Sequence, residues 1–273
     1  MEALEALVQK TLNTFQTSER TCKPYNPIEV MNNAQGSLTG YDCPKCKNKG
    51  VIYYAKDGYE FFKECECMKV RESIRRIEKS GLKETLEKST FKNFEIDMDF
   101  QKTMVAKAKG FLKDYQNNWF FIGGQVGCGK THICTAIVRK LLVGEGKNTR
   151  YLQWRDEVPK IKAKANSDEY EKLIEPWKTV EVLYIDDLFK TGKGKDEQEE
   201  QKPTAADINV AFEIINYRYR NPALITIISS QSEIKGLVGI DEAVGSRIFE
   251  KSRNYCINIS KDIKKNYRLK SMF

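Results

Sequence analysis

The chain of 273 residues is 40% hydrophobic and carries a net charge of +8, most of it from residues 247–273, which hold eight Lys and Arg against two Asp and Glu. This size allows one large domain or two, and the basic end is either a solvated tail or a surface that faces phosphate or nucleic acid. Because the sequence has neither an apolar run of membrane-spanning length nor a signal-peptide pattern, we expect a cytoplasmic protein with no membrane partner. In such a protein, eight cysteines favour bound metal or free thiols over disulfides.

The first 40 residues contain a helical pattern followed by a linker. A stripe of apolar residues predicts a helix that either packs on its own domain or binds a partner: Leu4, Val8, Leu12 and Phe15. The Pro and Gly residues of 21–40 then predict a loop.

Four cysteines flank a predicted hairpin. Two β-rich runs, 51–54 and 59–62, are separated by Asp57-Gly58, which is a strong signal for a tight turn. A hairpin brings its two ends together, so the thiols on either side would meet: Cys43, Cys46, Cys65 and Cys67. Four thiolates suit a closed, structural Zn²⁺ site, whereas the alternative is four unrelated buried thiols. We therefore predict a zinc ribbon at about residues 41–68.

The rest of the chain is predicted to be a helical connector and an α/β domain. Residues 69–88 are charged with a helical pattern, and we place one domain at 1–85 and the next at 86–273. In the second domain helix and strand patterns alternate, as in a parallel sheet flanked by helices. Its strand candidates are 119–122, 149–153, 181–186, 224–229 and 255–259. The charged segment 190–203 is predicted to be a long irregular loop.

Residues 124–131 match the P-loop pattern G-x-x-x-x-G-K-T between a predicted strand and a predicted helix. In such a loop the backbone N–H groups and the helix N-terminus bind phosphate. We expect Lys130 to reach the β- and γ-phosphates of ATP or ADP and Thr131 to ligate Mg²⁺. The alternative is a glycine-rich turn that happens to end in Lys-Thr. The expected nucleotide-binding residues are Gly124, Gly127, Cys128, Gly129, Lys130 and Thr131, with Cys128 contributing its backbone.

Two carboxylates, Asp186 and Asp187, follow a predicted apolar strand in the Walker B arrangement. We expect Asp186 to orient Mg²⁺ through water and Asp187 to polarise the attacking water. The alternative for this pair is a capped loop. Since Asp187 is one methylene shorter than the Glu often found there, we expect a slow, switch-like ATPase.

A later arginine is a candidate for catalysis between subunits. Arg247 offers a permanently charged, planar donor that could neutralise transition-state charge on a neighbour's nucleotide, or it could form a surface salt bridge with Glu250. The substitutes for this role would be Lys251 and Arg253.

Single-stranded DNA has two candidate contact segments. Residues 217–220 interleave Tyr and Arg, which suits stacked bases and phosphates, but a helix end with Tyr in the core and Arg outside gives the same pattern. The lysines at 160, 162 and 164 are either a solvated stretch or a second contact.

Residues 90–273 resemble the DnaC/DnaI-type replicative helicase loaders, AAA+ ATPases related to DnaA and IstB. The matching segments are 124–131, 185–187, 214–219, 226–230, 246–247 and 266–270. The resemblance implies an AAA+ domain without a C-terminal helical lid, which self-associates. We place Gln231, Arg268 and His132 beside the nucleotide, with Ser230 as the alternative to Gln231. Relatives commonly carry Asn in place of Gln231, and a lone His more often packs.

The cysteine-rich module resembles the zinc-bearing, helicase-binding domain of Gram-positive and phage-type loaders. The leading hypothesis is an ATP-dependent loader of a hexameric replicative helicase onto single-stranded DNA in replication initiation. One alternative is an IstB-like transposition helper, which the zinc ribbon disfavours. Another is an ATP-binding helicase adaptor with little hydrolysis, which Asp187 and Gln231 keep open.

Overall fold

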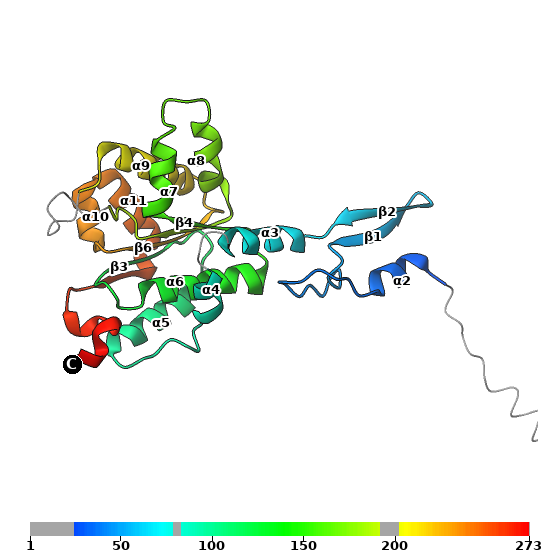
Figure 1. Cartoon of the computed structure of the whole chain (residues 1–273), viewed down its shortest axis with the longest axis horizontal. Helices are drawn as coiled ribbons and strands as arrows, with labels where there is room; N and C mark the ends of the chain where they lie inside the picture. Colours follow the sequence, from blue (N-terminus) through cyan, green and yellow to red (C-terminus); the bar gives the residue numbers. More distant parts are fainter. Residues whose placement is uncertain (1–24, 79–82, 192–201, 273) are drawn as a thin grey trace, which may run out of the picture.

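The computed structural model describes residues 25–78, 83–191 and 202–272, which form a small cysteine-rich module and an α/β domain (Figure 1). The predicted helix in residues 1–20 and most of the predicted loop 190–203 lie outside the described residues. Within the described part, no helix combines the length and the apolar character needed to cross a bilayer.

The cysteine-rich module is built on the predicted hairpin. Strands β1 (Val51–Lys56) and β2 (Tyr59–Glu64) pair antiparallel along their whole length. The two turn residues, Asp57 and Gly58, both have positive φ, 53° and 80°, as a two-residue type I′ hairpin turn requires.

Helix α2 (Pro27–Asn33) covers the outer edge of β1. The side-chain amide of Asn32 donates to the Tyr53 carbonyl at 2.8 Å and accepts from the Tyr53 N–H at 3.0 Å. These two bonds satisfy backbone groups that an edge strand otherwise leaves open.

The α/β domain contains a five-stranded parallel sheet in the order β4-β5-β6-β3-β7. Because all five strands run the same way, the residues that follow β3, β5 and β6 gather at one edge of the sheet. The strands lie within two residues of the predicted ranges, which confirms the predicted fold class: β3 (Phe120–Gly124), β4 (Thr149–Gln153), β5 (Val182–Asp186), β6 (Ile225–Ser230) and β7 (Cys256–Ile259).

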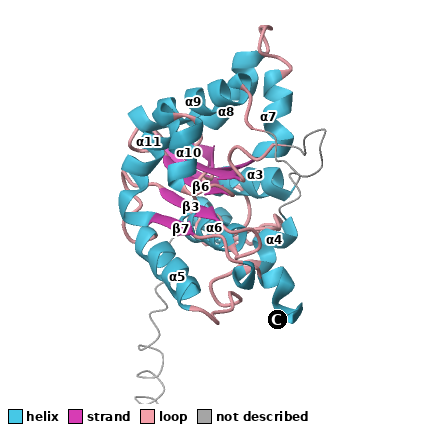
Figure 2. Cartoon of the chain, turned by 90° about the vertical axis from the view of Figure 1, so that its left-hand side faces the viewer, coloured by secondary structure: helices cyan, strands magenta, loops and turns pink. Residues whose placement is uncertain are grey.

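Helices cover both faces of this sheet (Figures 1 and 2). Successive side chains of β3 alternate between two apolar clusters, Phe120 and Ile122 in one and Phe121 in the other. One face carries α5 (Asp99–Phe111), α6 (Lys130–Arg139) and the π-helical turn η2 (Lys140–Gly144). The other carries α7 (Trp154–Lys162), α8 (Tyr170–Thr179), α9 (Ala205–Arg220), α10 (Ile234–Ile240) and α11 (Glu242–Ser252).

Short elements complete the domain: α4 (Lys83–Lys88), η3 (Arg253–Tyr255), η4 (Ile263–Lys265) and η5 (Tyr267–Met272). In the described residues after β7 the chain forms only 3₁₀ turns, and η5 lies beside the segment that leads into α5 (Figure 1).

Helix α3 (Cys67–Ile77) belongs to both parts of the molecule (Figure 1). Its buried Arg71 donates to the backbone carbonyls of Thr39 and Tyr41 in the module. Half a turn later, the Ser73 hydroxyl accepts a hydrogen bond from the N–H of Thr149, the first residue of β4, at 3.1 Å. The first part of the predicted connector is therefore a helix that holds the module with one half and packs on the edge of the sheet with the other.

Candidate functional site

The P-loop runs from β3 into α6, and its glycines permit a backbone that other residues would strain. Gly127 and Gly129 have φ of 74° and 95°. A Cβ on Gly129 would lie 2.7 Å from the Phe94 ring, and one on Gly127 would collide with the Asn266 side chain. The loop is thus packed against segments on both sides, and it presents Lys130, Thr131 and its backbone N–H groups to a ligand.

Lys130 lies inside the loop. Its ammonium donates to the carbonyls of Gly124 at 2.8 Å and Gln125 at 2.6 Å. Burial lowers the pKa of Lys130, because the charged form has lost water. A buried ammonium held only by carbonyl groups can exchange them for phosphate oxygens, which compensate its charge better.

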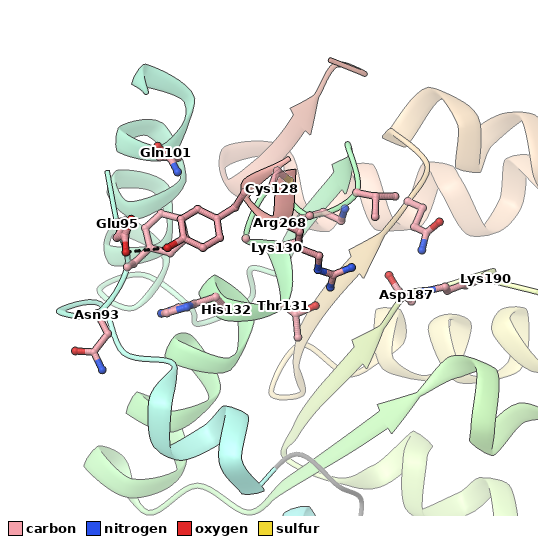
Figure 3. A pocket seen from close by; sticks show the side chains of 16 residues that line it. Asn93, Glu95, Gln101, Cys128, Lys130, Thr131, His132, Asp187, Lys190 and Arg268 are labelled. Carbon is pink, nitrogen blue, oxygen red and sulfur yellow. Dashed lines mark hydrogen bonds and ion pairs between the residues drawn. The ribbon is translucent and has the colours of Figure 1, made fainter. Parts of the chain in front are cut away.

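A cavity of about 330 Å³ opens beside the loop (Figure 3). Asn93, Glu95 and His132 lie toward one end, and Asp187 and Lys190 toward the other. Of the candidates from the sequence, the cavity lining includes Gly127, Cys128, Gly129, Lys130, Thr131, His132, Asp187, Gln231 and Arg268. Its volume lies at the lower end of the range for small-molecule sites.

Asp186, at the end of β5, is 8% exposed and accepts hydrogen bonds from four hydroxyl groups. The donors are Thr131 at 3.3 Å, Tyr151 at 2.8 Å, Tyr184 at 2.6 Å and Ser229 at 2.5 Å. Burial, followed by the charge of Asp186, raises the pKa of both Tyr151 and Tyr184, so these hydroxyls stay protonated. The carboxylate therefore stands next to Thr131, the position in which a Walker B residue orients water on Mg²⁺.

Asp187 is held in a different way. It has φ of 55°, which is uncommon for a residue other than glycine, and its N–H donates to the Ser229 hydroxyl at 3.0 Å. Its carboxylate accepts from the Lys190 ammonium at 2.6 Å. The Ser229 hydroxyl thus connects the Asp186 carboxylate, to which it donates, with the backbone N–H of Asp187, from which it accepts.

The sequence did not point to the contact between the start and the end of the α/β domain. The Tyr267 hydroxyl donates to Glu95 at 2.8 Å, and its N–H donates to the Gly127 carbonyl at 2.9 Å. Lys270 adds an ion pair with Asp97 at 2.6 Å. The segment from 266 to 270 is therefore tied both to the P-loop and to the other wall of the cavity.

His132 makes packing contacts at one end of the cavity. Its ring lies edge-on to Phe94, with centroids 5.2 Å apart, and its Nε2 lies 2.9 Å from the Thr90 carbonyl oxygen. His132 forms part of the cavity wall, and its contacts are those of a packing residue, as is common for a single histidine.

Arg247 does not line the cavity. It lies on α11, where its guanidinium donates to the Ala243 carbonyl at 2.7 Å and stacks on the rings of Phe212 and Tyr219, at 5.3 and 5.6 Å. Among the described residues it makes no ion pair with Glu250, whose carboxylate instead accepts from the Tyr219 hydroxyl. Arg247 is therefore not part of the cavity beside the P-loop of its own chain.

Arg218 overturns the expectation that the arginines of 217–220 lie outside. It is completely buried, and its guanidinium donates to Thr226 Oγ1 and to the carbonyls of Val180 and Ile225. Burial lowers the pKa of Arg218 to about 9. Because its donors join α9, β6 and the end of α8, Arg218 is a core residue that cannot reach nucleic acid.

The lysines of α7 and the turn after it are paired with carboxylates. The pairs are Lys160 with Glu157, Lys162 with Asp207, and Lys164 with Glu169. Their charges are locally balanced, which favours the solvated interpretation of this stretch over a DNA contact.

The four cysteines of the module converge as predicted. Their sulfur atoms lie within 4.8 Å of one another, and all four side chains are buried: Cys43, Cys46, Cys65 and Cys67. The Cys43–Cys65 and Cys46–Cys67 sulfurs are 3.8 and 3.6 Å apart. Four Zn–S bonds of about 2.3 Å in a tetrahedron require sulfurs about 3.8 Å apart, so this donor set fits Zn²⁺.

Comparison with known proteins supports the expected resemblance. The family model described as IstB-like ATP binding protein matches residues 63–270. The uncharacterized protein YqaM of Bacillus subtilis (strain 168) is 31% identical over 84% of this chain and 86% of that protein, and the phage-like element PBSX protein XkdC of the same strain is 30% identical over 85% and 88%. The replicative helicase loader DnaC of Escherichia coli (strain K12) is 25% identical over 46% and 51%.

Solved structures agree on the fold. The DnaC helicase loader superposes with a TM-score of 0.51 and 17% identity over 64% of this chain and 97% of that one. DnaI superposes with a TM-score of 0.51 and 20% identity over 65% and 92%. These likenesses confirm the predicted AAA+ type of sheet, and the family model spans most of the sequence. The chain belongs to the family of IstB-like ATP binding proteins.

Proposed function

We propose that this protein is an ATP-dependent loader of a hexameric replicative helicase onto single-stranded DNA in replication initiation. The observation that carries the proposal is the four-cysteine module, which α3 fixes to an ATP-binding domain of the IstB family. Similarity to the E. coli replicative helicase loader DnaC supports the same role. Residues 1–85 would then bind the helicase, and 86–273 would bind and hydrolyse ATP.

The contacts in the cavity support a division of roles. Lys130 and the N–H groups of the P-loop bind the phosphates, and the Lys130 ammonium is held by two carbonyl groups of the loop that phosphate oxygens can replace. Thr131 and Asp186 hold Mg²⁺, which supplies positive charge to the phosphates when it is bound. Asp187 polarises water, and Gln231 and Arg268 meet the phosphates from the cavity walls.

The cysteine cluster acts as a structural site. Its four sulfurs leave no open coordination position, so Zn²⁺ there would stabilise the module rather than catalyse a reaction. The cluster also includes Cys67, the first residue of α3, and the metal would therefore fix the start of the helix that contacts the ATPase domain.

Arg247 completes the site of a neighbouring subunit in the proposed assembly. Arg247 is half-buried on α11 and does not line the cavity of its own chain, which supports a role in trans. Stacking on Phe212 and Tyr219 holds the guanidinium without neutralising it, so it keeps the charge that a finger needs.

Binding of the full-length chain to a hexameric replicative helicase, measured by size-exclusion chromatography with light scattering, tests the proposal. We expect a complex that forms with the wild type and with Lys130→Ala but is lost on Cys43→Ser together with Cys65→Ser. Helicase loading onto a single-stranded DNA circle should fail for both variants. No complex between the wild type and a replicative helicase from the same host would refute the loader role.

A second candidate is an ATP-binding helicase adaptor with little hydrolysis. The ion pair between Asp187 and Lys190 favours it, because the ammonium competes for the carboxylate that would polarise water. Helicase binding together with no ATP turnover in the assembled complex would identify the adaptor.

A further inference from the structure

Asp186 has an unusual set of partners for a buried carboxylate. In the described part of the chain its hydrogen bonds come only from hydroxyl groups, on Thr131, Tyr151, Tyr184 and Ser229. A buried charge normally needs an opposite charge or a full set of hydrogen bonds. Here the hydroxyl groups supply the hydrogen bonds, so the negative charge of the Asp186 carboxylate remains available to a cation.

Two of these hydroxyls belong to tyrosines that the sequence offered only as strand residues. Tyr151 on β4 and Tyr184 on β5 are direct neighbours in the sheet register, and their rings lie 5.3 Å apart. Both are buried, at 7% and 0% exposure, in the apolar cluster beneath α6. Phenylalanine would fill the same space, so the packing does not explain the hydroxyl groups.

The two hydroxyls approach different oxygens of one carboxylate. Tyr184 donates to Oδ1 and Tyr151 to Oδ2, which fixes the rotation of the group about its last bond. The Thr131 contact, at 3.3 Å, is the longest of the four, and it is the one that must change when the Thr131 hydroxyl takes a metal ion. The carboxylate would keep its three shorter bonds and its orientation through that change.

We propose that Tyr151 and Tyr184 are positioning residues that hold the Asp186 carboxylate in the orientation that binds the water around Mg²⁺. The inference rests on the proposed assignment of Asp186 to magnesium. It adds β4 to a site that the sequence places at the ends of β3, β5 and β6.

Equilibrium binding of a fluorescent N-methylanthraniloyl ATP to the full-length chain, in EDTA and across a Mg²⁺ titration, tests the proposal without relying on turnover. We expect Tyr151→Phe and Tyr184→Phe to bind the probe in EDTA as the wild type does, because the P-loop is intact. The gain in affinity on adding Mg²⁺ should fall about tenfold, as expected for losing a hydrogen bond to a charged group. Tyr170→Phe is the matched control, since its hydroxyl donates to Glu213 at 2.7 Å, away from the cavity.

A double-mutant cycle separates positioning from a general loss of structure. In the Asp186→Asn background, Tyr151→Phe should have no further effect on the Mg²⁺-dependent gain. Additive effects in that cycle, or equal losses with and without Mg²⁺, would overturn the proposal. If Tyr184→Phe fails to fold, Tyr151→Phe alone decides the question.

The same data distinguish failure of this inference from failure of the proposed function. If Asp186→Asn leaves the Mg²⁺-dependent gain unchanged, the assignment of Asp186 to magnesium is wrong, and the inference falls with it. If Asp186→Asn abolishes the gain while both tyrosine variants keep it, the assignment stands and only the positioning role is refuted.

Discussion

The carboxylate of Asp187 lies 2.6 Å from the ammonium of Lys190, and both residues line the nucleotide cavity. The backbone of Asp187 is fixed independently, by its left-handed conformation and by the bond from its N–H to Ser229. The side chain is therefore free to change partner without moving the strand that holds Asp186. The Lys190 ammonium therefore competes with water for the Asp187 carboxylate.

Lys190→Gln should raise ATP hydrolysis by roughly two- to fivefold, because a partly exposed ion pair contributes up to about 1 kcal/mol. Single-turnover hydrolysis at saturating ATP measures the effect. Lys202→Gln removes the same charge from an exposed residue near the same loop and should leave the rate unchanged. A slower rate with a weaker affinity for ATP would instead assign Lys190 to phosphate binding.

Gly129→Ala should weaken nucleotide binding by more than tenfold. The new methyl group would lie 2.7 Å from the Phe94 ring, at a φ of 95° that alanine adopts only with strain. Gly144→Ala is the control, because a Cβ there meets no heavy atom within 4 Å. Titration with labelled ATP compares the two variants, and equal affinity would mean that the loop adjusts without loss.

Arg218→Ala should lower the free energy of unfolding by about 3 kcal/mol or more, since it removes the donors to several buried carbonyl groups. Arg220→Ala changes an exposed arginine two residues away and should alter stability by no more than about 0.5 kcal/mol. Urea denaturation measures both. A small effect at Arg218 would show that water replaces its contacts.

Zinc should bind the full-length chain with one ion per molecule, measured by atomic emission. Cys46→Ser should lose it, because one of four ligands is gone, while Cys256→Ser, outside the cluster, should keep it. Removal of zinc should leave ATP affinity within about twofold, since none of the cluster cysteines lines the nucleotide cavity. A full zinc content in Cys46→Ser would contradict the four-sulfur site.

The features that local patterns encode were predicted from the sequence. The turn at Asp57-Gly58 gives the hairpin its register, and the paired strands bring the segment before β1 next to the segment after β2, where the cysteines lie. The P-loop was likewise recognised from the fixed spacing of its glycines, lysine and threonine, and the strand before Asp186 from its short apolar run. The predicted fold class followed from the alternation of such runs.

The features that the sequence did not reveal depend on contacts across the sheet. Tyr151 and Asp186 are 35 positions apart, and the tyrosine looks like any other strand residue until β4 and β5 are paired in register. Arg218 lies among tyrosines and another arginine, so its pattern suggested a surface. Its partners are backbone carbonyls of other segments, which no spacing along the chain encodes.

Tyr267→Phe should make bound nucleotide dissociate up to about fivefold faster while association changes little. The hydroxyl ties η5 to Glu95 across the cavity, and an exposed bond of this kind contributes about 1 kcal/mol or less. The ring and the backbone bond to Gly127 remain, so the wall of the cavity is preserved. Stopped-flow displacement of labelled ATP measures the rate. Tyr255→Phe is the control, because it removes a similar bond, to Asp114 at 2.9 Å, between residues that do not line the cavity. Labelled ATP should dissociate from this variant at the wild-type rate. Equal dissociation from both variants would mean that Asn266 and the Gly127 carbonyl alone hold the segment against the P-loop.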